Sequence, residues 1–154
     1  MKAYAEYQLW LKSIVDEEIV KELKDMAEDP EHIIDAFYKN LSFGTGGLRG
    51  IIGAGTNRMN IYTVRKASQG IANYIKKKYP EQERKIAISY DSRIKSDAFA
   101  RTAAEVYAAN GIQVEIYSQL MPTPCLSYAV RELECAAGVM ITASHNPAKY
   151  NGYK

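Results

Sequence analysis

Short apolar segments alternate with helical patterns along the second half of this sequence, and this alternation limits the fold more than any other feature. Apolar runs stand at residues 85–90, 112–117 and 137–142. Helical spacing runs from about Ser96 to Gly111, and a shorter helical segment follows the PTP tripeptide at 122–124. Parallel strands need a crossover between them, so strands that alternate with helices indicate an α/β domain. We predict a mixed, largely parallel sheet with flanking helices.

Two segments ahead of these strands complete the predicted domain. Residues 61–79 carry apolar side chains on one helical face, and Pro80 stands just beyond them, so this segment is predicted to be a helix. Residues 41–60 hold six glycines, too many for a helix and more than a regular strand interior tolerates. We interpret this glycine-rich segment as irregular strands joined by a tight turn.

The start of the chain is predicted to be helical. Apolar positions in residues 4–28 recur at steps of three and four between charged ones, which indicates one amphipathic helix. A second, shorter helix follows, with Asp29 as its N-cap and Pro30 at its first position. We therefore divide the chain into a helical N-terminal extension, residues 1–40, and an α/β domain, residues 41–154.

Composition excludes several classes of protein and site. Of the 154 residues 47% are apolar, enough to bury a core, and a formal net charge of +2 gives no strong field for nucleic acid or an anionic membrane. Two cysteines without C-x-x-C spacing and two histidines argue against a disulfide scaffold and a zinc site, so we interpret the thiols as reduced and buried. No apolar stretch has the length of a signal peptide or a membrane span, and a cytoplasmic location is expected.

Chemically reactive side chains follow two of the predicted strands. Ser144 and His145 come just after the last apolar run, and Asp91 and Arg93 come just after the first. The carboxyl ends of parallel strands meet at one edge of a sheet, so these groups are expected to share that edge. For Asp91 and Arg93 we favour an ion pair or a helix cap over a direct catalytic role.

Ser144 has three alternative roles. A hydrolase nucleophile is disfavoured, because the G-x-S-x-G turn is missing and adjacent residues such as Ser144 and His145 point apart in an extended loop. A phosphoryl carrier fits better, since Lys149, Lys154 and Arg49 would offset the roughly two negative charges of a serine phosphate. An ordinary turn is the simplest explanation of an isolated Ser-x-Asn-Pro, and only the whole eleven-residue combination lowers its weight.

Other polar residues are given structural roles. Pro147 and Gly152 are expected to shape the serine loop, and Asn146 and Asn151 to hydrogen-bond it in place. His32 lies in the second predicted helix, and we interpret it as a surface or packing residue rather than a ligand.

The glycine-rich segment does not match the nucleotide-binding motifs. Gly50 and Gly55 have the spacing of a P-loop pair, but Thr56 and Asn57 stand where a lysine and a hydroxyl are required. The G-x-G-x-x-G pattern is also absent. A tight hairpin explains most of the glycines, whereas Arg49 has small neighbours and can present its guanidinium to an oxyanion.

Six short motifs follow one another along the sequence. They are FGTGGLRG, TNRMN, YDSR, PTP, TASHNP and NGYK. Together they resemble the phosphohexomutase superfamily, specifically its phosphoglucomutase/phosphopentomutase-like branch. The resemblance runs from about Leu41 to Lys154, and the serine loop is among its more specific motifs. The N-terminal helices resemble the extension that such branches carry.

The resemblance implies an enzyme that interconverts sugar 1-phosphates and 6-phosphates, with glucose 1-phosphate and glucose 6-phosphate as the first pair. It makes Ser144 the phosphoserine that exchanges phosphate with the sugar, through a sugar bisphosphate that serves as intermediate and activator. The phosphate on Ser144 is then a ligand of Mg2+. His145 and Lys154 match positions for proton transfer or charge stabilisation, and Arg49 matches the arginine beside the phosphoserine.

Alternatives remain within and outside this class. Phosphopentomutase and phosphomannomutase are alternatives within it, and a non-catalytic binding or interaction domain is the alternative from another class. The sequence leaves the identity of the sugar open. The expected partner is a sugar phosphate, and neither nucleic acid nor a membrane is expected.

The family pattern has four domains, and the chain resembles an incomplete first one. Neither a D-G-D-x-D-R metal loop nor a G-E-E-S-G phosphate loop occurs in it. We therefore expect an N-terminal fragment that lacks mutase activity by itself, because the groups that complete the metal site and hold the sugar are missing. We also expect an unpaired sheet edge, which favours self-association.

Overall fold

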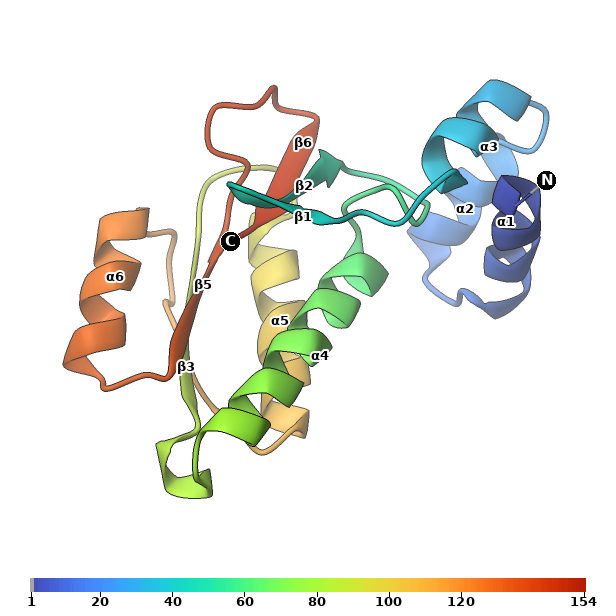
Figure 1. Cartoon of the computed structure of the whole chain (residues 1–154). Helices are drawn as coiled ribbons and strands as arrows, with labels where there is room; N and C mark the ends of the chain where they lie inside the picture. Colours follow the sequence, from blue (N-terminus) through green and yellow to red (C-terminus); the bar gives the residue numbers. More distant parts are fainter. Residues whose placement is uncertain (1) are drawn as a thin grey trace.

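The computed structural model describes residues 2–154 (Figure 1). The elements along the chain are α1 (Lys2–Ser13), α2 (Glu17–Asp25), α3 (Pro30–Phe37), β1 (Phe43–Gly44), β2 (Gly47–Ile51), α4 (Ile61–Lys78), the short 3-10 helix η1 (Glu81–Glu83), β3 (Lys85–Tyr90), α5 (Ser96–Ala109), β4 (Gln113–Ile116), α6 (Thr123–Glu132), β5 (Ala137–Ile141) and β6 (Tyr150–Tyr153). Every helix and strand predicted between residues 61 and 142 is present. No helix within residues 2–154 combines the length and the apolar character needed to cross a bilayer.

All six strands belong to one sheet, in the order β1-β2-β6-β5-β3-β4. Strand β3 is parallel to both of its neighbours, with Ile88 beside Ile116 of β4 and Val139 of β5. The other three pairs, which involve β1, β2 and β6, are antiparallel. A mixed sheet with flanking helices confirms the predicted α/β fold class, and its parallel part is the alternating segment from which that class was predicted.

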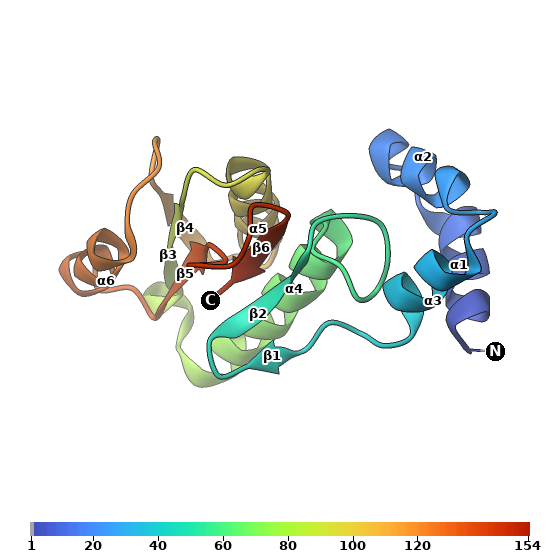
Figure 2. The same ribbon diagram turned by 90° about the horizontal axis from the view of Figure 1, so that it is seen from above.

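Helices cover both faces of the sheet (Figures 1 and 2). Helices α4 and α5 lie on one face, where the largest apolar cluster includes Ile88 and Phe99. Helix α6 lies on the other, where Leu126, Ala87 and Met140 form a smaller cluster. Side chains alternate along a strand, so Ile88 and Ala87 serve opposite faces. The burial of both faces explains the nearly continuous apolar runs of the parallel strands.

A tight turn at Thr45 and Gly46 joins β1 to β2, as predicted for the glycine-rich segment. Gly47 follows with a φ of +98°. A Cβ at this position would lie 2.6 Å from the carbonyl oxygen of Tyr153. Both the backbone conformation and the close approach of β6 therefore require glycine at residue 47.

The single helix predicted over residues 4–28 is wrong, because the structure contains two helices there. Asp16 interrupts the segment as an N-cap, and its Oδ1 accepts a hydrogen bond from the N–H of Ile19 at 3.0 Å. The N–H groups of Val15 and Asp16 both donate to the hydroxyl of Tyr62 at 3.3 Å. The apolar spacing continues across the break, so periodicity did not reveal it.

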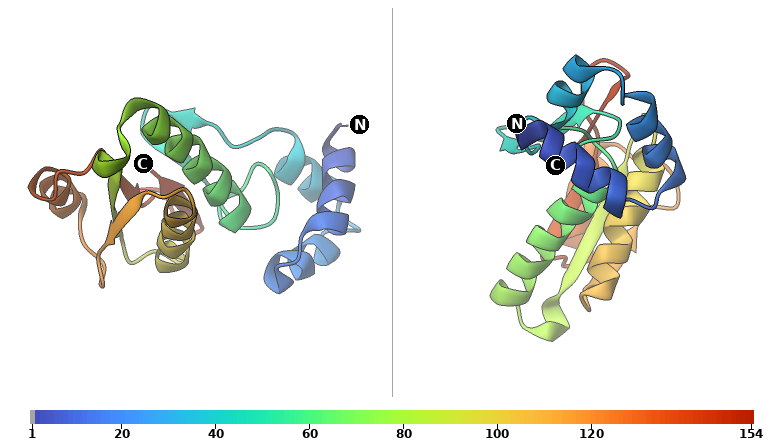
Figure 3. Two further views of the ribbon diagram at one scale, coloured as in Figure 1. Left: turned by 90° about the horizontal axis from the view of Figure 1, so that it is seen from below. Right: turned by 90° about the vertical axis from the view of Figure 1, so that its right-hand side faces the viewer.

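The first three helices share a core of their own, which is set apart from the sheet (Figure 3). Trp10 packs edge-on against Phe37 and against Tyr62 of α4, with ring centroids 5.5 and 5.6 Å apart. Ala54, in the loop after β2, is buried in the same cluster, and its N–H donates to Glu22 Oε2 at 2.6 Å. The helical extension is thus attached to the sheet domain at the start of α4 and at the loop after β2.

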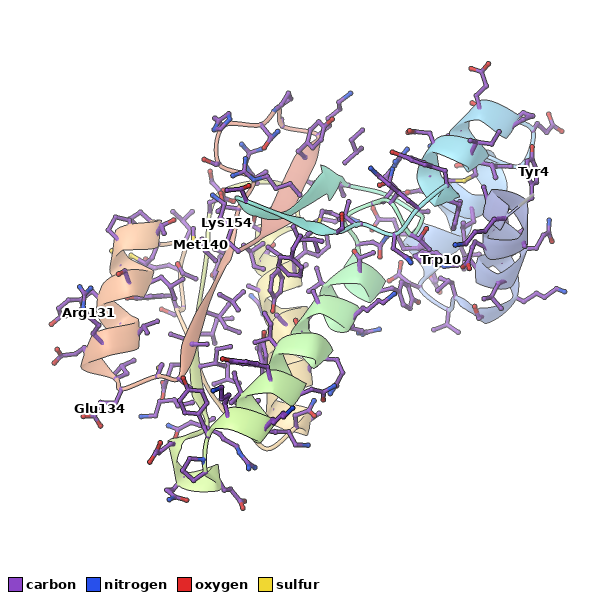
Figure 4. The ribbon with its side chains drawn as sticks, in the orientation of Figure 1. Tyr4, Trp10, Arg131, Glu134, Met140 and Lys154 are labelled. Atoms are coloured by element: carbon purple, nitrogen blue, oxygen red, sulfur yellow. The ribbon has the colours of Figure 1, made fainter. Side chains whose placement is uncertain are left out.

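The last strand, β6, was missed by the sequence analysis. Asparagine and glycine occupy its two middle positions, and both are depleted in strands. In the structure β6 lies between β2 and β5, with Tyr153 beside Ile141. Met140 and Lys154 exchange backbone hydrogen bonds of 2.9 and 3.0 Å and lie close together in Figure 4. The edge strands are therefore β1 and β4, and the final strand is an interior one.

Two residues expected to shape the serine loop belong to β6 instead. Asn151 is fully buried, and its Nδ2 donates to the carbonyl of Ile94 and to Ser96 Oγ, both at 2.9 Å. A Cβ at Gly152 would lie 2.5 Å from the carbonyl oxygen of Thr142. Asn151 therefore ties β6 to the start of α5, and Gly152 lets the strand approach the end of β5.

Candidate active site

A loop joins the carboxyl end of β5 to β6 (Figure 1). Ser144 lies in this loop, as predicted. The loop covers residues 142–149 and brings the chain back into the sheet as β6. Ser144 is exposed, and its φ of +59° lies in the left-handed region that serine rarely adopts. Its N–H donates to Thr142 Oγ1 at 2.9 Å. Within residues 2–154 the Ser144 hydroxyl has no hydrogen-bond partner, so it is open to carry a group.

Arg93, in the loop after β3, reaches across to the serine loop. Its Nη2 donates to the carbonyls of Ser144 and Asn146 at 2.6 and 2.7 Å. Its Nη1 donates to the carbonyls of Pro147 and Tyr150 at 3.1 and 3.2 Å. These contacts were not predicted, because the partners are backbone carbonyls more than 50 residues away and the pattern of side chains does not reveal them.

Asp91 holds the same arginine from the other side. Its Oδ2 lies 3.4 Å from Arg93 Nε, and its Oδ1 accepts hydrogen bonds from Arg93 N at 3.0 Å and from Ser96 Oγ at 2.7 Å. Ser96 is the first residue of α5. The predicted ion pair is confirmed. The alternative, a helix cap, is not formed, because the N-cap of α5 is Lys95 and Asp91 contacts the hydroxyl of Ser96 rather than a backbone N–H of the helix.

Arg49, on β2, is brought to the serine loop from the glycine-rich hairpin. Its Nη1 donates to Asn146 Oδ1 at 3.0 Å, and its Nε donates to the carbonyl of Gly46 at 3.3 Å. These are its only hydrogen bonds within residues 2–154. A guanidinium has five N–H donors, so three remain for a ligand. The structure therefore places Arg49 and Ser144 on the same rim of the sheet, as predicted.

The other predicted site residues are less engaged. Lys154 directly follows β6, and its side chain lies against the hairpin, with its Cγ 2.8 Å from where a Cβ at Gly47 would be. His145 is exposed and has no hydrogen bond to Ser144 within the described chain. Lys149 is exposed, with its ammonium 6.0 Å from the ring centre of Tyr150. No pair of these side chains acts directly on the serine hydroxyl.

His32 lies in α3, outside the sheet, and is exposed as predicted. Its N–H donates to Asp29 Oδ1 at 3.0 Å, which confirms Asp29 as the N-cap of this helix. The cysteines are free thiols, and Cys125 and Cys135 are partly buried, so their predicted burial is confirmed only in part. Burial nonetheless raises the pKa of the Cys135 thiol.

Buried hydroxyl groups support β6, the strand that precedes Lys154. The hydroxyl of Tyr153 is hydrogen-bonded to the hydroxyl of Tyr107 and, at 3.0 Å, to Ser68 Oγ. Ser68 belongs to α4 and Tyr107 to α5, so both helices are hydrogen-bonded to β6 through Tyr153. Burial raises the pKa of both tyrosines, because a phenolate is poorly solvated there.

An open hollow of about 430 Å³ lies beside the serine. It is lined by Asp91, Ser92, Arg93, Ile94, Ser144, Asn146 and Ala148. Hollows of about 570 and 590 Å³ lie against the N-terminal extension, but neither includes Ser144 or Arg93. Ser144, Asp91 and Arg93 all line the hollow of about 430 Å³, and we therefore take this hollow as the candidate site.

Residues 2–154 do not by themselves provide a cluster of side chains for a magnesium ion. Within residues 2–154 no three histidine, cysteine, aspartate or glutamate side chains are grouped where they could hold a metal ion. The carboxylate that lines the same hollow as Ser144, that of Asp91, is occupied by Arg93 and Ser96. Magnesium prefers six oxygen ligands, and an oxygen of a phosphate on Ser144 would supply one.

Similarity to known proteins agrees with this geometry. Residues 40–154 match the family described as "Phosphoglucomutase/phosphomannomutase, alpha/beta/alpha domain I". The chain is 44% identical over 148 residues to a probable phosphoribomutase of Schizosaccharomyces pombe and 42% identical over 146 residues to a phosphoglucomutase of Staphylococcus saprophyticus. These matches cover 94% and 95% of this chain but 25% and 26% of the relatives. A crystal structure described as a putative phosphomannomutase of Thermus thermophilus matches with a TM-score of 0.67 and 34% identity, over 75% of this chain and 25% of that one.

Proposed function

This chain belongs to the phosphoglucomutase/phosphomannomutase family, and from that membership we propose that Ser144 is the phosphoryl carrier of a sugar phosphate mutase. One observation carries the proposal: the hydroxyl of Ser144 has no hydrogen-bond partner within residues 2–154, and Arg49 is hydrogen-bonded to Asn146 of the same loop. The chain spans about a quarter of the length of its curated relatives, so the complete reaction is proposed for the protein that contains this domain.

The proposed reaction has two transfers. In the first, the bond between phosphorus and Ser144 Oγ breaks while a bond forms to the free hydroxyl oxygen of the sugar monophosphate, whose proton is lost. Ser144 Oγ takes up a proton and the sugar becomes a bisphosphate. In the second, the other phosphate of the bisphosphate returns to Ser144, and the isomeric sugar monophosphate leaves. A carrier is needed because the two sugar oxygens cannot exchange a phosphate directly.

The cations have charge-stabilising roles in this proposal. Arg49 would direct its three unused donors at oxygens of the Ser144 phosphate, where charge accumulates during transfer. Lys154, beside the hairpin, would add a second positive charge, and His145 would exchange a proton with the reacting hydroxyls. A bound Mg2+ would further neutralise the phosphate. The residues described here offer it no site beyond the phosphate itself.

Glucose 1-phosphate and glucose 6-phosphate are the proposed substrate pair, in a cytoplasmic enzyme. Relatives named for glucose and for ribose phosphates are similarly close, so a pentose phosphate is the second candidate and a mannose phosphate the third. The division into an extension, residues 1–40, and a phosphoserine domain, residues 41–154, stays part of the proposal. We also expect the 154-residue chain alone to be inactive as a mutase.

The experiment is to incubate the purified protein with glucose 1,6-bisphosphate and map the phosphorylated peptide by mass spectrometry. Phosphate on Ser144, lost in Ser144→Ala but kept in Ser118→Ala, supports the carrier. Ser118 is a matched control because it is an exposed serine away from the hollow. Phosphate on a residue other than Ser144 contradicts the proposal. The absence of any phosphorylated residue in a protein that still interconverts the sugar phosphates contradicts it too. A non-catalytic binding domain would bind the sugar phosphate without acquiring phosphate.

A further inference from the structure

The guanidinium of Arg93 directs its donors at groups inside the protein. Four N–H groups point at four backbone carbonyls of the segment from Ser144 to Tyr150, at 2.6 to 3.2 Å. The fifth, on Nε, faces Asp91 Oδ2 at 3.4 Å. An arginine has five donors, so four are engaged by the serine loop and the fifth lies in the ion pair with Asp91. Its side chain is also only 15% exposed.

Arg49 shows the opposite pattern in the same site. Two of its donors are engaged, and three are open. One arginine is therefore arranged to meet a ligand, and the other is arranged to hold the polypeptide. The two cannot exchange roles without breaking the contacts that position them.

The conformation of the serine loop explains why such a hold is needed. Ser144 has a φ of +59°, which is unfavourable for a residue with a side chain. Four carbonyl oxygens converge on one point, and they would repel one another without a cation between them. A planar guanidinium satisfies all four at once, whereas the ammonium of a lysine has three donors and no fork geometry.

From these contacts we propose that Arg93 is a positioning residue, which holds the serine loop and keeps Ser144 in its left-handed conformation. The consequence for catalysis rests on the proposed function: the loop must present Oγ in line with the reacting sugar oxygen. Misplacement of reacting atoms by about 1 Å can lower a rate by about 100-fold. Loss of Arg93 is therefore expected to lower kcat rather than to weaken sugar binding.

The first test examines the loop itself in the 154-residue chain. Arg93→Lys should shift the backbone amide and carbon resonances of residues 142–150 in NMR spectra and leave those of β3 and α4 in place. The matched control is Arg84→Lys, since Arg84 also donates to two backbone carbonyls, those of Tyr79 and Lys76, but lies away from the hollow. Arg84→Lys should leave the serine loop unchanged.

The second test is kinetic and uses the mutase that contains this domain. Arg93→Lys should lower kcat by about 100-fold and change the KM for the sugar phosphate by less than about twofold. If Arg93→Lys does not fold, Asp91→Asn is the second variant: it keeps the four carbonyl contacts of Arg93 and weakens only the contacts of Asp91 with Arg93 and Ser96, so it should shift the same resonances less. Unchanged loop resonances in both variants overturn the proposal, as does a raised KM at constant kcat, which is the signature of a direct ligand. A wild-type protein without mutase activity contradicts the proposed function instead, and the NMR result still decides the role of Arg93.

Discussion

Arg49 Nη1 lies 3.0 Å from Asn146 Oδ1, and this one side-chain hydrogen bond joins the glycine-rich hairpin to the loop that carries Ser144. The two residues stand 97 positions apart in the sequence. The sheet brings them together because β6 inserts between β2 and β5, which places the hairpin beside the end of β5. Arg49 is thereby oriented before any ligand arrives, which reduces the entropy that binding would otherwise cost.

Arg49→Lys is expected to lower the kcat/KM of the mutase by about 100-fold, because the charge remains but the directed donors are lost. Asn146→Ala leaves the arginine and removes its anchor, so a smaller loss of about tenfold is expected. A coupled assay for glucose 6-phosphate measures both. Arg101→Lys, at an exposed position on α5, is the control that should retain wild-type kinetics. Additive losses in the double variant would show that Asn146 does not act through Arg49.

Replacements of Ser144 separate its chemistry from its backbone. Ser144→Ala and Ser144→Gly both lack the hydroxyl, so both are expected to abolish nearly all mutase activity while the protein remains folded. Glycine tolerates the φ of +59° and alanine does not, so the glycine variant should be more stable by about 0.5–1 kcal/mol. Urea denaturation measures this difference. Near-normal turnover by either variant would refute the carrier role.

The sheet and the helices around it were predictable because their residues follow simple periods. Strands β3 and β5 are buried on both faces and therefore read as apolar runs, and α4 and α5 keep one apolar face. Strand β6 was not predicted, because its asparagine and glycine fit specific tertiary contacts rather than a strand pattern. Asn151 donates to the carbonyl of Ile94 and to Ser96 Oγ, and Gly152 allows a close approach to Thr142. The break at Asp16 was hidden for the opposite reason, since the apolar period runs through it.

Site residues were predictable where reactive side chains stand close together in the sequence. They were not predictable where their partners are backbone groups. Ser144 and Arg49 stand in unusual combinations of residues, and the structure brings them to one rim. Arg93 was assigned only its local partner, Asp91, because its four other partners are carbonyls in a loop that the chain reaches more than 50 residues later. A pattern of side chains contains no record of such contacts.

Tyr153→Phe is expected to destabilise the protein by about 1–3 kcal/mol, because it leaves two buried hydroxyls, those of Tyr107 and Ser68, without their partner. Tyr107→Phe should cost less, since Tyr153 then keeps Ser68. Thermal or urea unfolding measures the order of the two effects. Tyr74→Phe, at a side chain that is 58% exposed, is the matched control and should be neutral. Equal losses for both buried tyrosines would contradict the central position of Tyr153.

The free energy of unfolding should fall in alkaline solution because of the buried pair Tyr107 and Tyr153. Burial raises the pKa of Tyr107 and Tyr153 above the ordinary 10.0, so the folded state holds these protons more tightly than the unfolded state. Their contribution is complete below about pH 10 and is lost as the pH rises from there toward the folded pKa values, at up to about 1.4 kcal/mol per pH unit for each group. Urea denaturation between about pH 8 and about pH 11 measures the slope. The Tyr107→Phe/Tyr153→Phe variant should show a shallower slope, and an equal slope would assign the effect to other groups.

Trp10→Ala tests whether the helical extension and the sheet domain are separate units of stability. Trp10 is 9% exposed and touches both Phe37 and Tyr62, so its loss is expected to cost about 3–5 kcal/mol within the extension. Leu9→Ala is the matched control on the same helix, because Leu9 is 57% exposed and its truncation should be nearly neutral.

The location of that loss is the informative part. The extension has its own apolar cluster, and the sheet has another, so a defect at Trp10 should open α1 to α3 and the loop around Ala54 without opening β3 or β5. Hydrogen exchange resolved by residue measures this directly. Faster exchange confined to residues 2–40 and the loop after β2 supports the division at residue 40. Faster exchange throughout the sheet would show instead that the contact of Trp10 with Tyr62 at the start of α4 makes the chain one cooperative unit.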